Sequence, residues 1–269
     1  MAYIVAALIG YAGYRARALT RGGAVAACLV GGTVFGFGGL GCAILLVLFF
    51  ASSSALSFFK SSNLRKQKAA ETFEKGGKRD AAQVLANGGI AALASLLLAL
   101  SGGNPTYFGA FVGALAAATA DTWATEIGVL STRPPRLLTT GKVVPAGTSG
   151  AVTWLGSGAA ILGAGFIGLV AALLSLFPLF SVPTAHPLSV VAAGVLGGTA
   201  GMLIDSLLGA TLQASYWCPV CGKPTESRVH RCGTPTELRH GFALLNNDVV
   251  NVTGTLAGAI VGTVIAAVL

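Results

Sequence analysis

The feature that most constrains this chain is the placement of its basic residues. All 17 Lys and Arg residues of the 269-residue sequence fall in four short segments, separated by long apolar stretches. These stretches are close to the roughly 20 residues that a helix needs to cross a bilayer. Only 10% of the residues are charged, against about 25% in soluble domains. We therefore expect an integral membrane protein built from helices.

The apolar pattern predicts an all-α polytopic bundle of about eight transmembrane helices in a single domain, residues 1–269. The predicted helices cover residues 2–19, 22–38, 40–59, 80–101, 105–130, 150–177, 187–215 and 246–269. Only the sequence GFGGLG separates the second helix from the third, so these are either two spans or one broken span, which would make seven. The N-terminus lacks the leading charge and the cleavage site of a signal peptide, and we expect a retained first helix.

The basic segments also predict the orientation, because Lys and Arg accumulate in loops on the cytoplasmic side. With eight helices they are the loops after the first, third, fifth and seventh helices, and the intervening turns contain no Lys or Arg. Both termini would then lie outside, in a bacterial inner membrane or an equivalent bilayer. The net charge of +8 is explained by this topology and favours phosphates or anionic lipid at the cytoplasmic face. We expect no nucleic-acid partner.

Acidic residues inside the predicted helices are the strongest candidates for function, because a charge in the bilayer costs several kcal/mol unless it is paired or hydrated. Asp121 and Asp205 fall at nearly the same depth in the fifth and seventh helices, in the cytoplasmic third. Glu126 lies one turn beyond Asp121, and Asp80 and Asp248 open the fourth and eighth helices. We expect these acids to converge on a polar cavity open to the cytoplasm. The alternative is that each polar group only bonds one helix to another.

Further polar side chains accompany the acids at a spacing of four residues, which places them on one helix face. These pairs are Thr122 with Glu126, Arg79 with Gln83, Gln83 with Asn87, and Asn247 with Asn251. Carboxylates with hydroxyl and amide oxygens suit Mg²⁺, which binds one or two carboxylates together with substrate phosphates. We predict Asp121, Glu126 and Asp205 as magnesium ligands, assisted by Asp248.

Two loops are candidates for phosphate binding. Lys78 and Arg79 follow two glycines directly before the fourth helix, whose N-terminal N–H groups favour an anion. Thr148 and Ser149 lie in the sequence GTSG before the sixth helix, where either could instead be an N-cap. Lys60 could contact a phosphate or anchor the third helix at the membrane surface. Phosphate-binding loops, acids and an apolar bundle together predict a substrate with a phosphate head and an apolar tail.

The last basic loop, residues 216–245, contains the sequence CPVCGKPTESRVHRCG. Cys218, Cys221, His230 and Cys232 have the spacing and the soft ligand atoms of a tetrahedral structural Zn²⁺ site. His240 could replace His230, and free thiols without a metal are the alternative. A disulfide is not expected in a reducing cytoplasmic loop.

Six separated sequence blocks resemble, in order, the signature blocks of the transmembrane protein 19-like family. They are SSSALSFFK, GGKRDAAQVLANGG, ATADTWATEIGVLS, PAGTSGAVTWLG, CPVCGKPTE and NNDVVN. That family includes phytyl-phosphate kinases, which add a second phosphate to an isoprenoid monophosphate from a nucleoside triphosphate. The resemblance points, without assigning roles, to Lys60, Lys78, Arg79, Asp80, Gln83, Asn87, Asp121, Thr122, Glu126, Thr148, Ser149, Asn247, Asp248 and Asn251.

Together, the residues and the resemblance predict a membrane kinase that converts an isoprenyl monophosphate of the phytyl or geranylgeranyl type to its diphosphate, with Mg²⁺ and CTP or ATP. Lys78 and Arg79 would bind phosphates, and the carboxylates would be metal ligands rather than a general base. One alternative is a transporter or flippase of a phosphorylated lipid or anion, with the similar Asp121 and Asp205 segments as a repeat. Another is a cytidylyltransferase that forms a CDP-lipid. Both a monomer and a homodimer are compatible with the sequence.

Overall fold

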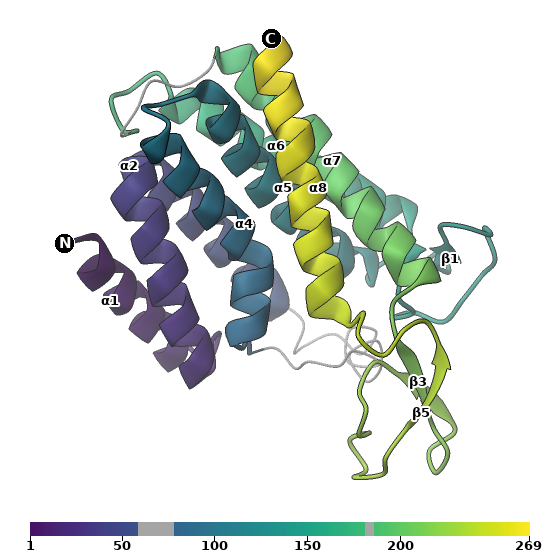
Figure 1. The fold of residues 1–269 in the computed structure, drawn as a ribbon. Coiled ribbons are helices and arrows are strands. Elements are labelled where there is room, and N and C mark those ends of the chain that lie inside the picture. The colour runs from purple at the N-terminus through teal and green to yellow at the C-terminus, as the bar shows by residue number, and fades with distance from the viewer. Residues whose placement is uncertain (59–77, 181–185) are drawn as a thin grey trace.

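The computed structural model describes residues 1–58, 78–180 and 186–269, which form a helical bundle with two small sheets (Figure 1). The helices are α1 (Ala2–Arg15), α2 (Arg21–Phe58), α4 (Ala81–Leu100), α5 (Pro105–Gly128), α6 (Trp154–Leu174), α7 (Pro187–Thr211) and α8 (Asn247–Val268). The strands β1 (Arg136–Leu137) and β2 (Ala151–Val152) pair antiparallel. The second sheet is antiparallel in the order β4 (Lys223–Thr225), β3 (Ser215–Cys218) and β5 (Glu237–His240). The predicted helical membrane bundle is confirmed.

Helix α2 is a helical hairpin, which resolves the uncertainty about the second and third predicted helices. Gly39 has φ +82° and ψ −174° in its middle, a backbone conformation that glycine adopts readily. Both ends of α2 meet Arg79: a Cβ on Gly23 would collide with its carbonyl oxygen, and Ser54 Oγ accepts a hydrogen bond from its guanidinium at 2.8 Å. A straight helix would hold Gly23 and Ser54 roughly 46 Å apart at 1.5 Å per residue. The chain therefore folds back at Gly39, and the two arms are two helices.

Three predicted helices extend beyond the observed ones. The predictions 2–19, 150–177 and 187–215 correspond to Ala2–Arg15, Trp154–Leu174 and Pro187–Thr211. Helix α1 ends because Arg17 has φ +60° and Leu19 then forms a bridge with Arg79. Helix α6 begins late because β2 pairs with β1, and helix α7 ends early because β3 pairs with β4 and β5. These pairings join distant segments, so the hydropathy of one segment does not indicate them.

Helix α5 is the centre of the bundle. Every residue from Phe108 to Ala120 is buried, and α5 contacts α4, α6, α7 and α8. Among the described helices, α2, α4, α6, α7 and α8 are long and apolar enough to cross a membrane. The more polar C-terminal part of α5 carries Asp121 and Glu126, so the central helix brings carboxylates to one end of the bundle.

Helices α5, α7 and α8 approach one another closely through glycines. A Cβ on Gly258 of α8 would lie 2.5 Å from the carbonyl oxygen of Gly113 in α5 and 3.1 Å from that of Gly197 in α7. Small residues that let helix backbones touch are the usual basis of helix packing in membranes. The close packing at Gly258 fixes the relative depth of the three helices and therefore of the polar residues at their ends.

Candidate functional site

A polar cavity of ≈ 270 Å³ lies where helix ends meet. It is bounded by the end of α2, the starts of α4, α6 and α8, the ends of α5 and α7, and the loop 146–153. Most of the predicted site residues line it: Arg79, Gln83, Asn87, Asp121, Thr122, Glu126, Thr148, Ser149, Asp205, Asn247 and Asn251. The structure therefore brings together residues from four predicted helices and two predicted loops.

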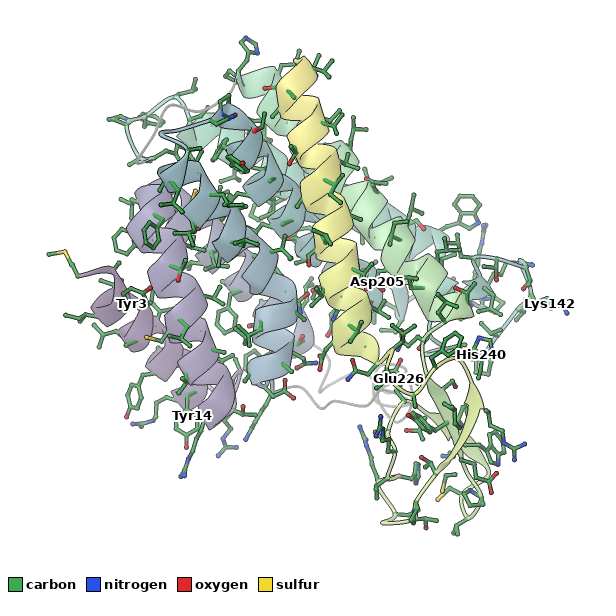
Figure 2. All side chains as sticks on the ribbon, viewed as in Figure 1. Tyr3, Tyr14, Lys142, Asp205, Glu226 and His240 are labelled. Atoms are coloured by element: carbon green, nitrogen blue, oxygen red, sulfur yellow. The ribbon has the colours of Figure 1, made fainter. Side chains whose placement is uncertain are left out.

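The acids of the cavity come from different elements. Asp121 and Glu126 are on α5 and Asp205 is on α7. Figure 2 shows Asp205 in the bundle and Glu226 where the bundle meets the second sheet. Glu126 is only 7% exposed, and its Oε1 accepts a hydrogen bond from Ser57 Oγ at 2.8 Å. Asp205 lies against α8, because a Cβ on Gly254 would be 3.4 Å from the Asp205 Cβ. Carboxylates from two helices thus face one polar space.

The guanidinium of Arg79 is held in the wall of this cavity. The Arg79 backbone N–H donates to Ala18 and its carbonyl accepts from Thr20, both at 2.9 Å, which fixes the residue beside the end of α1. Its side chain donates to Ser54 at 2.8 Å and lies 5.5 Å from the centre of the Phe50 ring. These contacts hold the positive charge of Arg79 in the wall of the carboxylate-lined cavity, beside the C-terminal end of α2.

Helix α4 starts where it was predicted to start, but its first N–H groups are not all unpaired. Asp80 is its N-cap, and the Asp80 carboxylate accepts a hydrogen bond from the Gln83 N–H at 2.9 Å. The expectation of unpaired N–H groups for a phosphate is therefore wrong for Gln83. Lys78 is exposed, and neither Lys78 nor Asp80 is among the residues that line the cavity. Lys60 lies outside the described residues.

The loop 146–153 forms one wall, but it does not begin α6 as predicted. Thr153 is the N-cap of α6 and accepts a hydrogen bond from the Gly156 N–H at 3.0 Å, so capping by Thr148 or Ser149 is wrong. The Thr148 hydroxyl donates to the Pro145 carbonyl at 2.8 Å. Gly150 has φ +71° and packs against Ala210 of α7. The loop is held by α7 and presents its hydroxyl groups to the cavity from the side.

Among the cavity residues that the sequence analysis did not predict are two that lie in or beside the second sheet. Glu226 follows β4, and its Oε1 accepts hydrogen bonds from Ser149 Oγ at 2.5 Å and from Gln213 Nε2 at 3.0 Å. Gln213 is 3% exposed. Its distance of eight residues from Asp205 would have indicated the same helix face, whereas nothing in the sequence indicated Glu226. Asp248, in contrast, lies in the first turn of α8 and does not line the cavity.

A second cavity, of ≈ 290 Å³, adjoins the polar one. It lies between α1, the two arms of α2 and the first turns of α4, and it includes Leu40, Ala43 and Val47. Among the described residues its lining is apolar except for Arg79, Gln83 and Asn87. The same three residues line the polar cavity, so an apolar space and a polar space share one wall.

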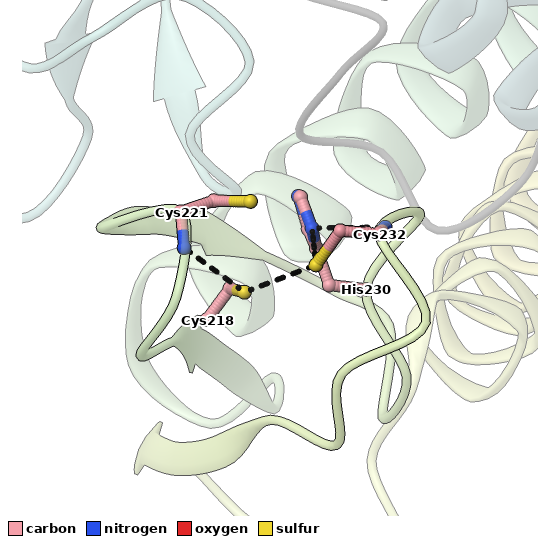
Figure 3. Close-up of side chains that lie close together, drawn as sticks. All are labelled: Cys218, Cys221, His230 and Cys232. Atoms are coloured by element: carbon pink, nitrogen blue, oxygen red, sulfur yellow. Dashed lines mark hydrogen bonds between the residues drawn. The ribbon is translucent and has the colours of Figure 1, made fainter.

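The four predicted zinc ligands lie together at the second sheet (Figure 3). Their ligand atoms are all within 4.8 Å of one another, and they belong to Cys218, Cys221, His230 and Cys232. Hydrogen bonds with Thr234 and His230 lower the pKa of the Cys232 thiol to about 6, which favours the thiolate. His240, the alternative ligand, is on β5 and is not part of the group.

These features define a polytopic helical membrane protein with a carboxylate-lined polar cavity at one end of its bundle. The chain belongs to the DUF92 family of integral membrane proteins, whose sequence profile matches residues 4–259. It is 34% identical over 273 residues to Protein PGR of Arabidopsis thaliana, covering 95% of this chain and 91% of that protein. No solved structure matches the chain.

Two further relatives have similar coverage of this chain. The uncharacterized membrane protein MJ0933 of Methanocaldococcus jannaschii is 34% identical over 251 residues, covering 93% of this chain and 87% of that protein. The chloroplastic Protein VTE6 of Arabidopsis thaliana is 26% identical over 247 residues, covering 90% of this chain and 64% of that protein. The similarity therefore extends over the whole bundle.

Proposed function

We propose that this protein is a membrane kinase that transfers a phosphoryl group from CTP or ATP to an isoprenyl monophosphate of the phytyl or geranylgeranyl type. The observation that carries the proposal is the wall of Arg79, Gln83 and Asn87 between a carboxylate-lined cavity and an apolar one. An acceptor with a charged head and a hydrocarbon tail fits both sides of this wall. The resemblance of the six sequence blocks to a family that includes phytyl-phosphate kinases supports the same reaction.

The donor atoms of the polar cavity fit Mg²⁺. Carboxylate oxygens from α5 and α7, hydroxyl oxygens from Thr122 and Ser206, and amide oxygens from Asn247 and Asn251 face one space, and oxygen ligands are those that Mg²⁺ prefers. In our proposal Asp121 and Asp205 hold the ion, with Glu126 beside them. The ion would supply the usual chemistry of phosphoryl transfer, which is to neutralise charge on the phosphate oxygens of the donor.

The chain's own residues would orient the two substrates. The Arg79 guanidinium, at the border of the two cavities, would bind the acceptor phosphate, while Arg133 and the hydroxyl groups of Thr148 and Ser149 would contact the nucleotide phosphates. An acceptor phosphate oxygen forms a bond to the γ-phosphorus, the bond from that phosphorus to the β–γ bridging oxygen breaks, and the nucleoside diphosphate leaves. Because the acceptor is already an anion, no side chain has to remove a proton.

The shape of the polar site favours an enzyme over a transporter. An alternating-access transporter has its site near the midplane, between repeats that rock around it. Here the polar cavity is at one end, and α5, α7 and α8 are in backbone contact beyond it, at Gly113, Gly197 and Gly258. A cytidylyltransferase would use the same cavity but would release pyrophosphate, so product analysis distinguishes it from the kinase.

The test is an assay of the detergent-purified protein with Mg²⁺, CTP or ATP, and geranyl, farnesyl, geranylgeranyl or phytyl monophosphate. We expect the isoprenyl diphosphate and the nucleoside diphosphate in equal amounts. Asp121→Asn should lower turnover by at least roughly 100-fold, since the loss of a metal ligand removes several kcal/mol of stabilisation. Glu237→Gln is the control, because Glu237 lies on β5 with its side chain 59% exposed. Folded protein without turnover on any of these acceptors, or release of pyrophosphate, would refute the kinase.

A further inference from the structure

The Cys and His residues of the second sheet form a compact group whose role the kinase proposal does not include. We propose that Cys218, Cys221, His230 and Cys232 bind a structural Zn²⁺ ion, and that this ion fixes Glu226 in the wall of the polar cavity. The zinc site does not depend on the proposed kinase activity. Its first test is metal content, which is measured without any substrate.

The geometry of the group is close to that of a metal-bound site. Cys218 Sγ and Cys232 Sγ are 3.7 Å apart, and His230 Nδ1 is 3.1 Å from Cys232 Sγ. Tetrahedral zinc, with Zn–S near 2.3 Å and Zn–N near 2.0 Å, requires ligand atoms about 3.5 to 3.8 Å apart. Since all four atoms lie within 4.8 Å of one another, shifts of about 1 Å or less would complete the tetrahedron.

Two tight turns present the ligands. After β3, the Cys221 N–H donates to Cys218 Sγ at 3.5 Å, and Gly222, with φ +62°, donates its N–H to the Cys218 carbonyl at 2.9 Å. Before β5, Gly233 has φ +85° and donates to the His230 carbonyl at 2.8 Å. Both turns use a glycine where a left-handed backbone is required. The polypeptide thus brings two ligand pairs from two separate turns to one point.

The alternatives to zinc are weaker. A disulfide needs sulfur atoms about 2.05 Å apart, and all five cysteines of the chain are free. Three thiolates and one imidazole are soft ligands, which favour zinc over Mg²⁺ or Ca²⁺. The four protein ligands fill a tetrahedral site and leave no position for a substrate. The chemistry of the group is therefore that of a structural ion.

The second sheet has little core of its own, so an ion would contribute much of its stability. Its strands have three or four residues each, and five large apolar side chains of the segment 216–245 are exposed: Val220, Val229, Leu238, Phe242 and Leu244. Small units without a sufficient apolar core commonly rely on a metal or on disulfides. Here the disulfide is absent and the ligand group is present.

The link from the ligand group to the polar cavity is short. Cys221 lies two residues before β4, and Glu226 directly follows it. The pairing of β3 with β4 places Cys218 opposite Lys223 and Tyr216 opposite Thr225, so the ladder runs from the ligands to the residue before Glu226. The carboxylate of Glu226 in turn accepts hydrogen bonds from Ser149 and Gln213. A fixed ligand group therefore fixes the position of Glu226 and, through it, the loop 146–153.

The experiment is elemental analysis of the detergent-purified full-length chain. We expect about one zinc per chain, and His230→Asn or Cys221→Ser should lower the zinc content by at least roughly tenfold. His240→Asn and Cys28→Ser are the matched controls and should retain zinc, because neither residue belongs to the group. Wild-type protein without stoichiometric zinc, or equal loss in His230→Asn and His240→Asn, would overturn the site.

A second measurement covers the case in which the ligand variants fail to fold. Wild-type protein from cells grown with Co²⁺ should show thiolate-to-cobalt charge-transfer absorption, and a chelator should abolish it. The chelator should also expose the segment 216–245 to limited proteolysis, with protection restored by Zn²⁺. Glu226→Gln should keep its zinc but lose part of this protection, since it weakens the contact with Ser149 and Gln213. Proteolysis that does not respond to the chelator would refute the role of the ion in holding Glu226.

Discussion

Replacing one glycine at the centre of the bundle should both destabilise the protein and displace its polar site. In Gly258→Ala the new Cβ would lie 2.5 Å from the Gly113 carbonyl oxygen and 2.7 Å from the Ala117 Cβ. Ordinary contacts begin near 3.4 Å, so α8 and α5 would have to separate by about 0.9 Å (3.4 minus 2.5). Such overpacking costs about 1–3 kcal/mol. The greater helix propensity of alanine returns about 0.5–1 kcal/mol, which leaves a net loss of up to about 2.5 kcal/mol.

The control is Gly158→Ala in α6, where no atom lies within 4 Å of the new Cβ. It should be neutral or stabilise the protein by up to about 1 kcal/mol, because only the propensity term remains. Unfolding of both variants in mixed micelles of a mild detergent and SDS, followed by tryptophan fluorescence, gives the comparison. Gly258→Ala should also lower turnover, since α8 carries Asn247 and Asn251. Equal stability of the two variants would refute the close helix packing from which the shift is calculated.

Two other predictions concern the two cavities. Arg79→Gln should raise the KM for the isoprenyl monophosphate by roughly tenfold or more, because a hydrogen bond from a charged group is worth about 1.5–3 kcal/mol. The control is Lys78→Gln, since Lys78 is exposed. Equal changes of KM for the two variants in initial-rate assays would contradict the role of Arg79. Ala43 lines the apolar cavity near the Gly39 turn, far from Arg79 along the α2 arm. Ala43→Phe should therefore block the end of a long tail and shift the preference from geranylgeranyl towards geranyl monophosphate. We expect a shift of roughly tenfold or more, since each buried CH₂ is worth about 0.8 kcal/mol. An unchanged ratio of kcat/KM between these acceptors would show that the tail binds elsewhere.

Much of the polar cavity was predictable because the bilayer imposes a common depth on helices. A basic segment at one end of each span, together with a rise of 1.5 Å per residue, was sufficient to place Asp121 and Asp205 at one level. Asn247 and Asn251 followed from their spacing at the start of a span. These inferences need only local sequence and a fixed membrane thickness, and the structure places all four residues in one lining.

The remaining parts depend on contacts between distant segments. The sequence placed the break between residues 38 and 40, but deciding for a hairpin over one broken span required knowing that both ends of α2 touch Arg79. The Glu226 carboxylate reaches the cavity because β4 pairs with β3 and because Ser149 lies beside it, 77 residues earlier in the chain. Asp248 was predicted to assist the metal ligands, and on α8 it directly follows the lining residue Asn247 without lining the cavity itself.

The arrangement of the two cavities also explains how one bundle can contain both a carboxylate-lined space and an apolar one. Carboxylates in an apolar environment are costly unless other polar groups surround them, and here they lie at helix ends, where Ser57, Ser149 and Gln213 donate hydrogen bonds to Glu126 and Glu226. The apolar cavity is on the other side of Arg79, beside the α2 hairpin, which carries no acid. Between α5, α7 and α8, Gly258 leaves no space for even one methyl group. A polar cavity that is closed at this depth fits the kinase that we propose better than a transporter, because in the proposed reaction only the head group of the acceptor has to reach the carboxylates.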